Sequence, residues 1–387
     1  MTLLLVCLCG CTALPGPAAE IFAVPGTGIR MEMVRVPGGR FARGEDGEVR
    51  VRPFWISTRE VTWADFDYFF EFPGQEEEDG VTRPSSGKSY LMLSGLPPDF
   101  MEPGRPVTNL RFHSALAYCE WLSRRTGMIF RLPTEAEWEV ACRAGGEGEG
   151  WHRGNSGGRT HAAGEGRPDA LGLRDMLGNA WEYCLEPQRP PDFEPVLRGG
   201  AWNSPPSDLK ASSRKTALPE WSEADPNRPF SVWWFRDGYS QGFRVVRVPE
   251  ASGPEERAAC ARKIEISGLA GRERVAKVAG SAMHFSRVTG TVRNGGDRPL
   301  EELALKVFYL DPQGRPHLED TTSTQTRRAT FNVCFPVLAN SAHPGPHAAP
   351  LRPGESRAFA VDLPLSFDSE DRVDATRFGA SVLYVIK

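Results

Sequence analysis

Residues 130–142 read FRLPTEAEWEVAC, and every local signal in this stretch indicates a turn that leads into a helix. Pro133 ends the extended run before it, and Thr134 can cap the helix with its hydroxyl oxygen. Glu137 stands three residues after Thr134 and can complete a capping box. Three side chains then recur at helical spacing and predict an apolar, buried face: Trp138, Ala141 and Cys142. Taken alone, the stretch is an ordinary capped core helix.

Four more motifs surround this helix in order along the chain. NLRFHSALAYCEWLSRRTG (residues 109–127) precedes it, and DMLGNAWEYC (175–184), LRGGAWN (197–203) and GFRVVR (242–247) follow it. This ordered set resembles the formylglycine-generating enzyme and sulfatase-modifying factor family, over about Met31 to Val248. Five motifs in the right order are specific, whereas any one of them is not. The resemblance implies an α+β domain with a loop-rich fold of the C-type-lectin type.

The composition is that of a soluble globular protein with room for two or three domains. Of the 387 residues, 40% are hydrophobic and 25% are charged, and 40 glycines and 33 prolines indicate many turns. The formal charge of −4 gives no argument for nucleic acid or an anionic membrane surface as a partner. The seven histidines form no HxxxH or HExxH pair, so the sequence predicts no histidine-based metal site.

The amino terminus, MTLLLVCLCGCTALPGPAAE, is typical of an export signal. Leu3 to Cys9 is far too short to span a bilayer. Leu8 to Cys11 resembles a bacterial lipobox, in which Cys11 would be lipidated after cleavage. A plain signal peptide cut near Ala18 and a cytoplasmic chain are the alternatives. We expect an exported protein of the periplasm or cell envelope that meets the membrane only through its lipid anchor.

Changes in composition divide the chain into five segments. A signal peptide is expected over residues 1–19 and a linker over 20–30. The family-like domain follows at 31–248, and a charged linker at 249–262. The remainder, 263–387, shows short strand patterns separated by turns, which predict a small all-β sandwich. This second domain resembles the immunoglobulin-like modules of the FxLYD type.

Local signals place the first elements of the family-like domain. Met33 to Phe41 reads as strand, turn and strand. Thr62 is the expected cap of a helix that has Asp65 at its third position. A second helix is expected over residues 113–125, and Gly127 after it would supply a left-handed cap.

The motif DMLGNAWEYC is a candidate calcium site. Gly178 to Glu182 alternates, so the carbonyls of Gly178 and Ala180 are expected to face one side. The family resemblance implies four ligands, at Asp175, Gly178, Ala180 and Glu182. Calcium prefers such hard oxygen ligands. We therefore expect a structural calcium ion; in the alternative, Asp175 serves a turn and Glu182 a salt bridge.

The family's oxidases hold copper(I) with two cysteines after the RGG strand, and oxygen activation there converts a substrate cysteine into formylglycine. Counted from Arg198, those places fall on Ser204 and Leu209 in this chain. A hydroxyl is a poor copper(I) ligand and leucine is none, so copper is not expected. The mature chain keeps five cysteines, whose pairing the sequence cannot give: Cys119, Cys142, Cys184, Cys260 and Cys334.

Three functions stay open. The favoured one is a non-oxidase binding or scaffold protein with an unknown protein, peptide or glycan partner at the cell surface. The second is an enzyme of different chemistry, as in family branches that use non-haem iron, although the helical domain that holds this iron is absent from the sequence. The third is a formylglycine-generating oxidase with rearranged metal ligands. The lost copper ligands favour the first, because fold alone does not imply function.

Overall fold

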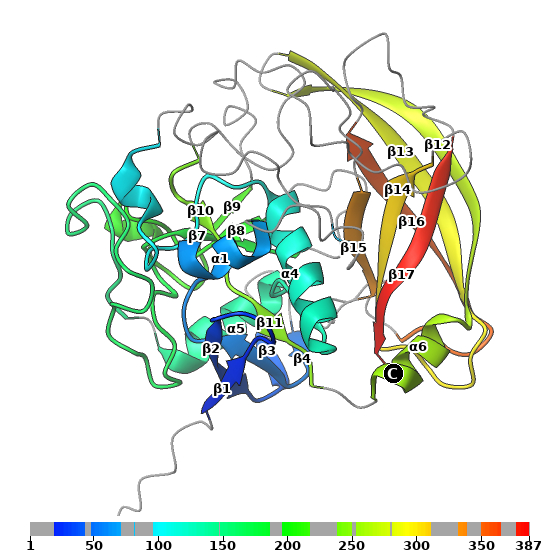
Figure 1. The fold of residues 1–387 in the computed structure, drawn as a ribbon, viewed down its shortest axis with the longest axis horizontal. Coiled ribbons are helices and arrows are strands. Elements are labelled where there is room, and N and C mark those ends of the chain that lie inside the picture. The colour runs from blue at the N-terminus through cyan, green and yellow to red at the C-terminus, as the bar shows by residue number, and fades with distance from the viewer. Residues whose placement is uncertain are drawn as a thin grey trace, which may run out of the picture.

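The computed structural model describes residues 19–42, 48–70, 81, 96–146, 148–185, 196–216, 238–249, 253–278, 281–310, 332–338, 350–364 and 377–386. It is a mixed structure of helices and sheets in two parts that lie side by side (Figure 1). The first part, coloured blue to green, combines helices with short strands and loops. The second, coloured yellow to red, is built from long strands. Within the described residues, no helix is both long and apolar enough to cross a bilayer.

A five-stranded antiparallel sheet brings distant segments of the first part together. Its order is β1 (Ala19–Ala23), β2 (Arg30–Val36), β5 (Phe54–Ser57), β11 (Val246–Arg247) and β6 (Phe130–Arg131). Strand β11 comes from the GFRVVR motif, and β6 leads into the FRLPTEAEWEVAC helix. The last motif in the chain therefore lies directly beside the central one.

A second, four-stranded sheet carries the two motifs that lie between the central helix and GFRVVR in the sequence. Its order is β10 (Gln241–Gly242), β7 (Trp181–Cys184), β8 (Val196–Arg198) and β9 (Arg214–Thr216), with only β10 and β7 parallel. Strands β3 (Gly39–Ala42) and β4 (Glu48–Val51) form a separate hairpin. The DMLGNAWEYC and LRGGAWN motifs are thus neighbours through β7 and β8.

The helices of the first part are α1 (Trp63–Phe70), α4 (Phe112–Thr126) and α5 (Glu135–Gly145), with 3₁₀ turns η2 (Pro98–Met101) and η3 (Pro206–Asp208). They agree with the predicted signals at the starts of α1 and α5 and at the end of α4. The capping box between Thr134 and Glu137 is present in both directions. Thr62 caps α1 and exchanges hydrogen bonds with Asp65. Gly127 ends α4 with a φ of 71°.

Two apolar clusters fill the first part. The larger one is built around α1 and α4, where Phe66 stacks on Tyr118 with ring centroids 5.6 Å apart. The smaller one joins β2, β4 and β5 to the buried face of α5. The three side chains predicted for that face are 0 to 1% exposed: Trp138, Ala141 and Cys142.

The second part consists of two three-stranded antiparallel sheets and one helix. The first sheet has the order β12 (Ile264–Val278), β13 (Ser281–Asn294) and β16 (Ser356–Pro364). The other has the order β15 (Asn332–Leu338), β14 (Glu302–Tyr309) and β17 (Phe378–Ile386). A separate apolar cluster fills this part. The resemblance to an immunoglobulin-like sandwich of the FxLYD type stays a prediction.

Both segments predicted as linkers contain regular structure, which corrects the sequence-based boundaries. Residues 20–30 hold most of β1, which pairs with β2, and Phe22 packs its ring on Phe130. Residues 249–262 hold α6 (Pro254–Ala261). Proline in the first turn, followed by Glu255 and Glu256, is a helix-start signal that the charged, small-residue composition concealed.

Buried ion pairs join the two parts. Arg131 donates to both carboxylate oxygens of Glu137 at 2.6 and 2.7 Å, and its Nε donates to Glu302 of β14 at 3.3 Å. Glu302 also accepts a hydrogen bond from Arg52 at 2.5 Å. Further along β14, Lys306 donates to Glu120 of α4 at 3.0 and 3.1 Å. Strand β14 is therefore fixed to the first part by charged contacts.

Candidate functional site

A fully buried arginine links three of the motifs. Arg244 of GFRVVR donates to the two carboxylate oxygens of Glu182 at 2.6 and 2.7 Å, and neither side chain is exposed. Trp138 Nε1 donates to the same carboxylate at 2.7 Å. Such a bidentate pair fixes orientation as well as charge. Contacts to the Glu182 carboxylate thus hold three segments together: the GFRVVR motif, β7 and α5.

The arginine of the RGG motif forms buried ion pairs with α5. Arg198 is 2% exposed and donates to Glu135 at 3.1 Å and to Glu139 at 2.7 Å, both on α5. It also donates to the carbonyl of Ala211 at 2.6 Å. Its guanidinium lies 5.4 Å from the centroid of the Trp138 ring. Strand β8 is therefore held against α5 by charge and by ring contact.

The first glycine after Arg198 lets another stretch of backbone approach closely. Gly178 donates its N–H to the carbonyl of Gly199 at 2.8 Å. Their φ angles are 83° and 95°, values that favour glycine. A Cβ on Gly178 would lie 2.2 Å from the Trp151 carbonyl oxygen, and one on Gly199 would lie 2.6 Å from that of Met176. Main-chain crowding thus explains why glycine stands at both positions.

The four predicted calcium ligands lie along one bend of the chain, but its backbone is not extended as expected. Gly178 and Asn179 have φ angles of 83° and 58°, so regular alternation begins only at β7. Asp175 has a φ of 53° and accepts the Gly164 N–H at 2.7 Å. Glu182 is paired with Arg244. In this structure Asp175 serves a turn and Glu182 an ion pair, which are the alternative roles named above.

Sequence reasoning missed a third carboxylate at this place. Glu60, two residues before the Thr62 cap, is fully buried and accepts a hydrogen bond from Asn179 at 3.0 Å. Burial, and then the charge of Asp175, raise the pKa of Glu60 well above its ordinary value. Burial likewise raises the pKa of Asp175. Glu60 stands just before Val61 and the Thr62 cap in the sequence. No local signal shows that its side chain faces a segment more than one hundred residues away.

Carboxylate oxygens gather at this place, although no group of three or more His, Cys, Asp or Glu side chains within the described residues is arranged to hold a metal ion. Glu60 Oε2 is a buried oxygen that has no hydrogen-bond partner among the described residues. The fully buried cation at this place is Arg244. It interacts electrostatically with three carboxylates: Glu182, Glu60 and Asp175. Carboxylate and carbonyl oxygens are the ligands that calcium prefers. Since Arg244 already pairs with Glu182, a cation would have the carboxyls of Glu60 and Asp175 available, and their raised pKa values mean that it would have to displace their protons. The calcium site stays a prediction.

The two places of the family's copper cysteines have packing roles here. Ser204 is 6% exposed, and its Oγ accepts the Ala201 N–H at 3.0 Å. Leu209 lies against Gly200, with a methyl carbon 3.0 Å from where a Cβ would stand. Leu209 also packs on the apolar cluster around α5. Neither side chain offers a sulfur ligand.

Three cysteines of the first part are buried, among them Cys142 of the predicted apolar face. Cys119, Cys142 and Cys184 are at most 3% exposed and lie on α4, α5 and β7. Burial raises the pKa of Cys184 well above its ordinary value, which disfavours the thiolate that binds metals. Cys11 and the predicted leader lie outside the described residues, so lipidation and export stay predictions.

Comparisons with known proteins agree with the motif resemblance. The model of the sulfatase-modifying factor enzyme 1-like domain matches residues 22–226, more than half of the chain. Formylglycine-generating enzyme of Streptomyces coelicolor is 28% identical over 270 residues, covering 49% of this chain and 82% of that protein. Inactive C-alpha-formylglycine-generating enzyme 2 of Bos taurus is 27% identical over 241 residues, covering 46% and 78%.

A third relative is much longer than the shared region. Serine/threonine-protein kinase Pkn1 of Chlamydia trachomatis is 29% identical over 221 residues, which is 47% of this chain but 35% of the kinase. The chain therefore spans about a third of that relative's length, and the likeness is to one segment of it.

Proposed function

Because the chain belongs to the family of sulfatase-modifying factor enzyme 1-like domains, we propose that it is a non-oxidase member, which uses the family scaffold to bind a protein, peptide or glycan. The observation that carries this proposal is the pair of residues at the copper positions. Copper(I) is held by soft thiolate ligands, and Ser204 and Leu209 provide a hydroxyl and an alkyl group instead. Both side chains are used in packing.

The motif residues support the same proposal. Arg131, Arg198 and Arg244 bind glutamates of other motifs within the interior. These pairs maintain the architecture without any need for turnover. A relative named formylglycine-generating enzyme matches at 28% identity, and one named inactive C-alpha-formylglycine-generating enzyme 2 matches at 27%. Overall similarity therefore cannot separate an oxidase from a non-oxidase member. The proposal rests instead on the residues at the copper positions.

The test is an assay for formylglycine formation. Purified full-length protein, supplied with copper and oxygen, is incubated with a CxPxR-type peptide, and aldehyde is detected with an aminooxy probe. We expect no aldehyde and no tight copper(I) binding. The Streptomyces coelicolor relative, treated identically, is the positive control. Aldehyde formed by this chain, and lost when oxygen is removed, would establish the oxidase and refute the proposal.

We also propose that calcium stabilises the scaffold at Asp175, Gly178, Ala180 and Glu182. The orphaned oxygen of Glu60 supports a cation close to this set. An ion that binds only the folded state adds about 2.7 kcal/mol when its concentration is one hundred times its Kd. Calcium is therefore expected to raise the melting temperature by roughly 5 °C over a chelated sample.

Variants give the calcium measurement its specificity. Asp175→Asn is expected to abolish the calcium-dependent shift, whereas Asp297→Asn, at an aspartate whose side chain is 77% exposed in the second part, should retain it. Melting curves with calcium, with magnesium and with chelator make the comparison. Identical melting of the wild-type protein in all three solutions would count against the calcium site.

A further inference from the structure

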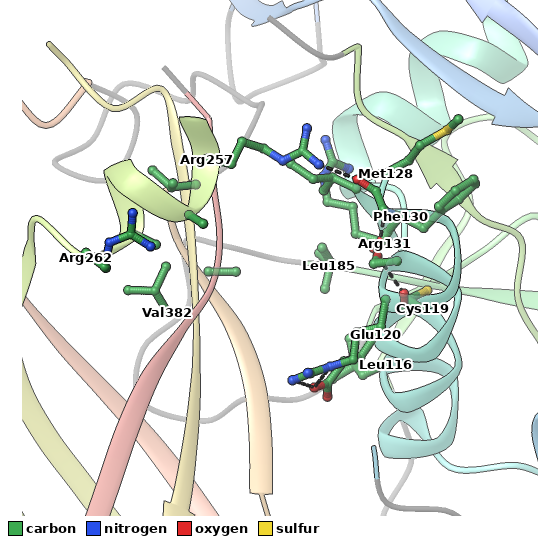
Figure 2. A pocket seen from close by; sticks show the side chains of 18 residues that line it. Leu116, Cys119, Glu120, Met128, Phe130, Arg131, Leu185, Arg257, Arg262 and Val382 are labelled. Carbon is green, nitrogen blue, oxygen red and sulfur yellow. Dashed lines mark hydrogen bonds and ion pairs between the residues drawn. The ribbon is translucent and has the colours of Figure 1, made fainter. Parts of the chain in front are cut away.

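A cavity of about 500 Å³ lies where the two parts meet (Figure 2). Helix α4 and the segment that leads into β6 line one side. Helix α6, β14 and β17 line the other. Ligand cavities in proteins typically measure about 300 to 1,000 Å³. The cavity is therefore large enough for a small molecule, and neither the glycine strand nor the carboxylates of Glu60, Asp175 and Glu182 are among its lining residues.

Apolar side chains from both parts form the wall. Leu116, Phe130 and Leu185 come from the first part, and Ala261 and Val382 from the second. Leu116, Phe130 and Leu185 are at most 8% exposed. These side chains contribute no charge or strong hydrogen-bonding group to the cavity. An occupant would therefore need a substantial apolar body.

The charges around the cavity are unbalanced. Glu120 is the acidic residue among the described lining residues, and it is already engaged by Lys306 and Arg124. Arg257 donates a hydrogen bond to the Gly127 carbonyl at the carboxyl end of α4, where a cation is favourable. Arg262 is exposed, and its side chain makes no ion pair or hydrogen bond within the described part of the chain.

We propose that this cavity binds a single-chain fatty acid, or a molecule of the same chemical class, with its tail between the two parts and its carboxylate at Arg262. The apolar side chains of the wall suit a hydrocarbon tail. The uncommitted guanidinium at the end of α6 fits a carboxylate, which it can bind through two parallel hydrogen bonds. Figure 2 shows Arg262 on the α6 side of the cavity and Phe130 and Leu116 across from it.

The first arm of the test varies the head group of the ligand. Full-length protein is titrated by calorimetry with dodecanoate and with dodecyltrimethylammonium, both below their micelle concentrations. Dodecanoate is expected to bind with one molecule per chain. The cationic amphiphile should bind at least about tenfold more weakly, because it meets like charge at the rim. Equal binding of the two would refute a carboxylate site.

The second arm changes the cavity itself. Arg262→Gln is expected to weaken dodecanoate binding about fivefold, the scale of one partly exposed ion pair. Arg272→Gln removes an exposed arginine of β12 that does not line the cavity, and it should bind like the wild type. Ala258→Trp on α6 places an indole in the opening and should reduce binding more than about tenfold.

Thermal melting shows that each variant is folded, so that lost binding can be assigned to the cavity. Failure of the wild type to bind dodecanoate would overturn the proposal. Binding that Ala258→Trp and Arg262→Gln both leave unchanged would also overturn it, because the amphiphile would then be adsorbed elsewhere. The copper and aldehyde assay is independent of either outcome.

Discussion

Arg244→Met is expected to destabilise the protein by about 3 to 5 kcal/mol, because it leaves Glu182 charged, buried and without its cation. Glu182 has no exposed surface, and Arg244 holds it through contacts of 2.6 and 2.7 Å. Arg244 also donates to the carbonyls of Ser57 and Arg174, which would lose these hydrogen bonds. Urea unfolding, followed by tryptophan fluorescence, measures the change.

An exposed pair provides the matched control for Arg244. Arg40 and Glu48 are in contact at 3.2 Å but are 69% and 59% exposed. Arg40→Gln should change the free energy of unfolding by less than about 0.5 kcal/mol. If Arg244→Met were as mild as Arg40→Gln, water would have to reach Glu182, and the proposed lock between the motifs would be wrong.

Arg131→Met should produce a loss of similar size, about 3 to 5 kcal/mol, because it leaves the buried Glu137 without its cation and removes one of the two arginines that bind Glu302. Glu137 and Glu302 are both 0% exposed, and Arg131 is 4% exposed. Glu302 would retain Arg52, whereas Glu137 would lose its cation. Limited proteolysis across 249–262, combined with urea unfolding, would report whether the second part also separates.

Two further variants assign that loss. Arg124→Gln changes an arginine that is 48% exposed and pairs with Glu120, so less than about 0.5 kcal/mol is expected. Adding Glu137→Gln to Arg131→Met should recover part of the stability, because a buried amide needs no countercharge. A double variant less stable than Arg131→Met alone would contradict the assignment to Glu137.

The sequence predicted the local features of the first part well. Thr134, Thr62 and Gly127 define helix ends through contacts within a few residues, which a pattern can reveal. The buried face of the central helix followed from the helical spacing of Trp138, Ala141 and Cys142. The motif order indicated the family, which the family model confirms.

The long-range partners could not be predicted in the same way. Nothing near Arg244 indicates that it pairs with Glu182, and nothing near Arg131 indicates Glu302. Ion pairs across 62 and 171 positions are fixed by the packing of whole elements. The role of Glu60 was missed for the same reason. Strand β1 was missed because its pairing with β2 outweighs the composition of the segment.

Arg131 joins a helix start in the first part to a strand of the second. A recombination event that removed the second part from the gene would therefore expose the base of α5 as well as the surface of α4. The halves are expected to be inherited as one unit, and a newly fused replacement would need an acidic residue at the position of Glu302.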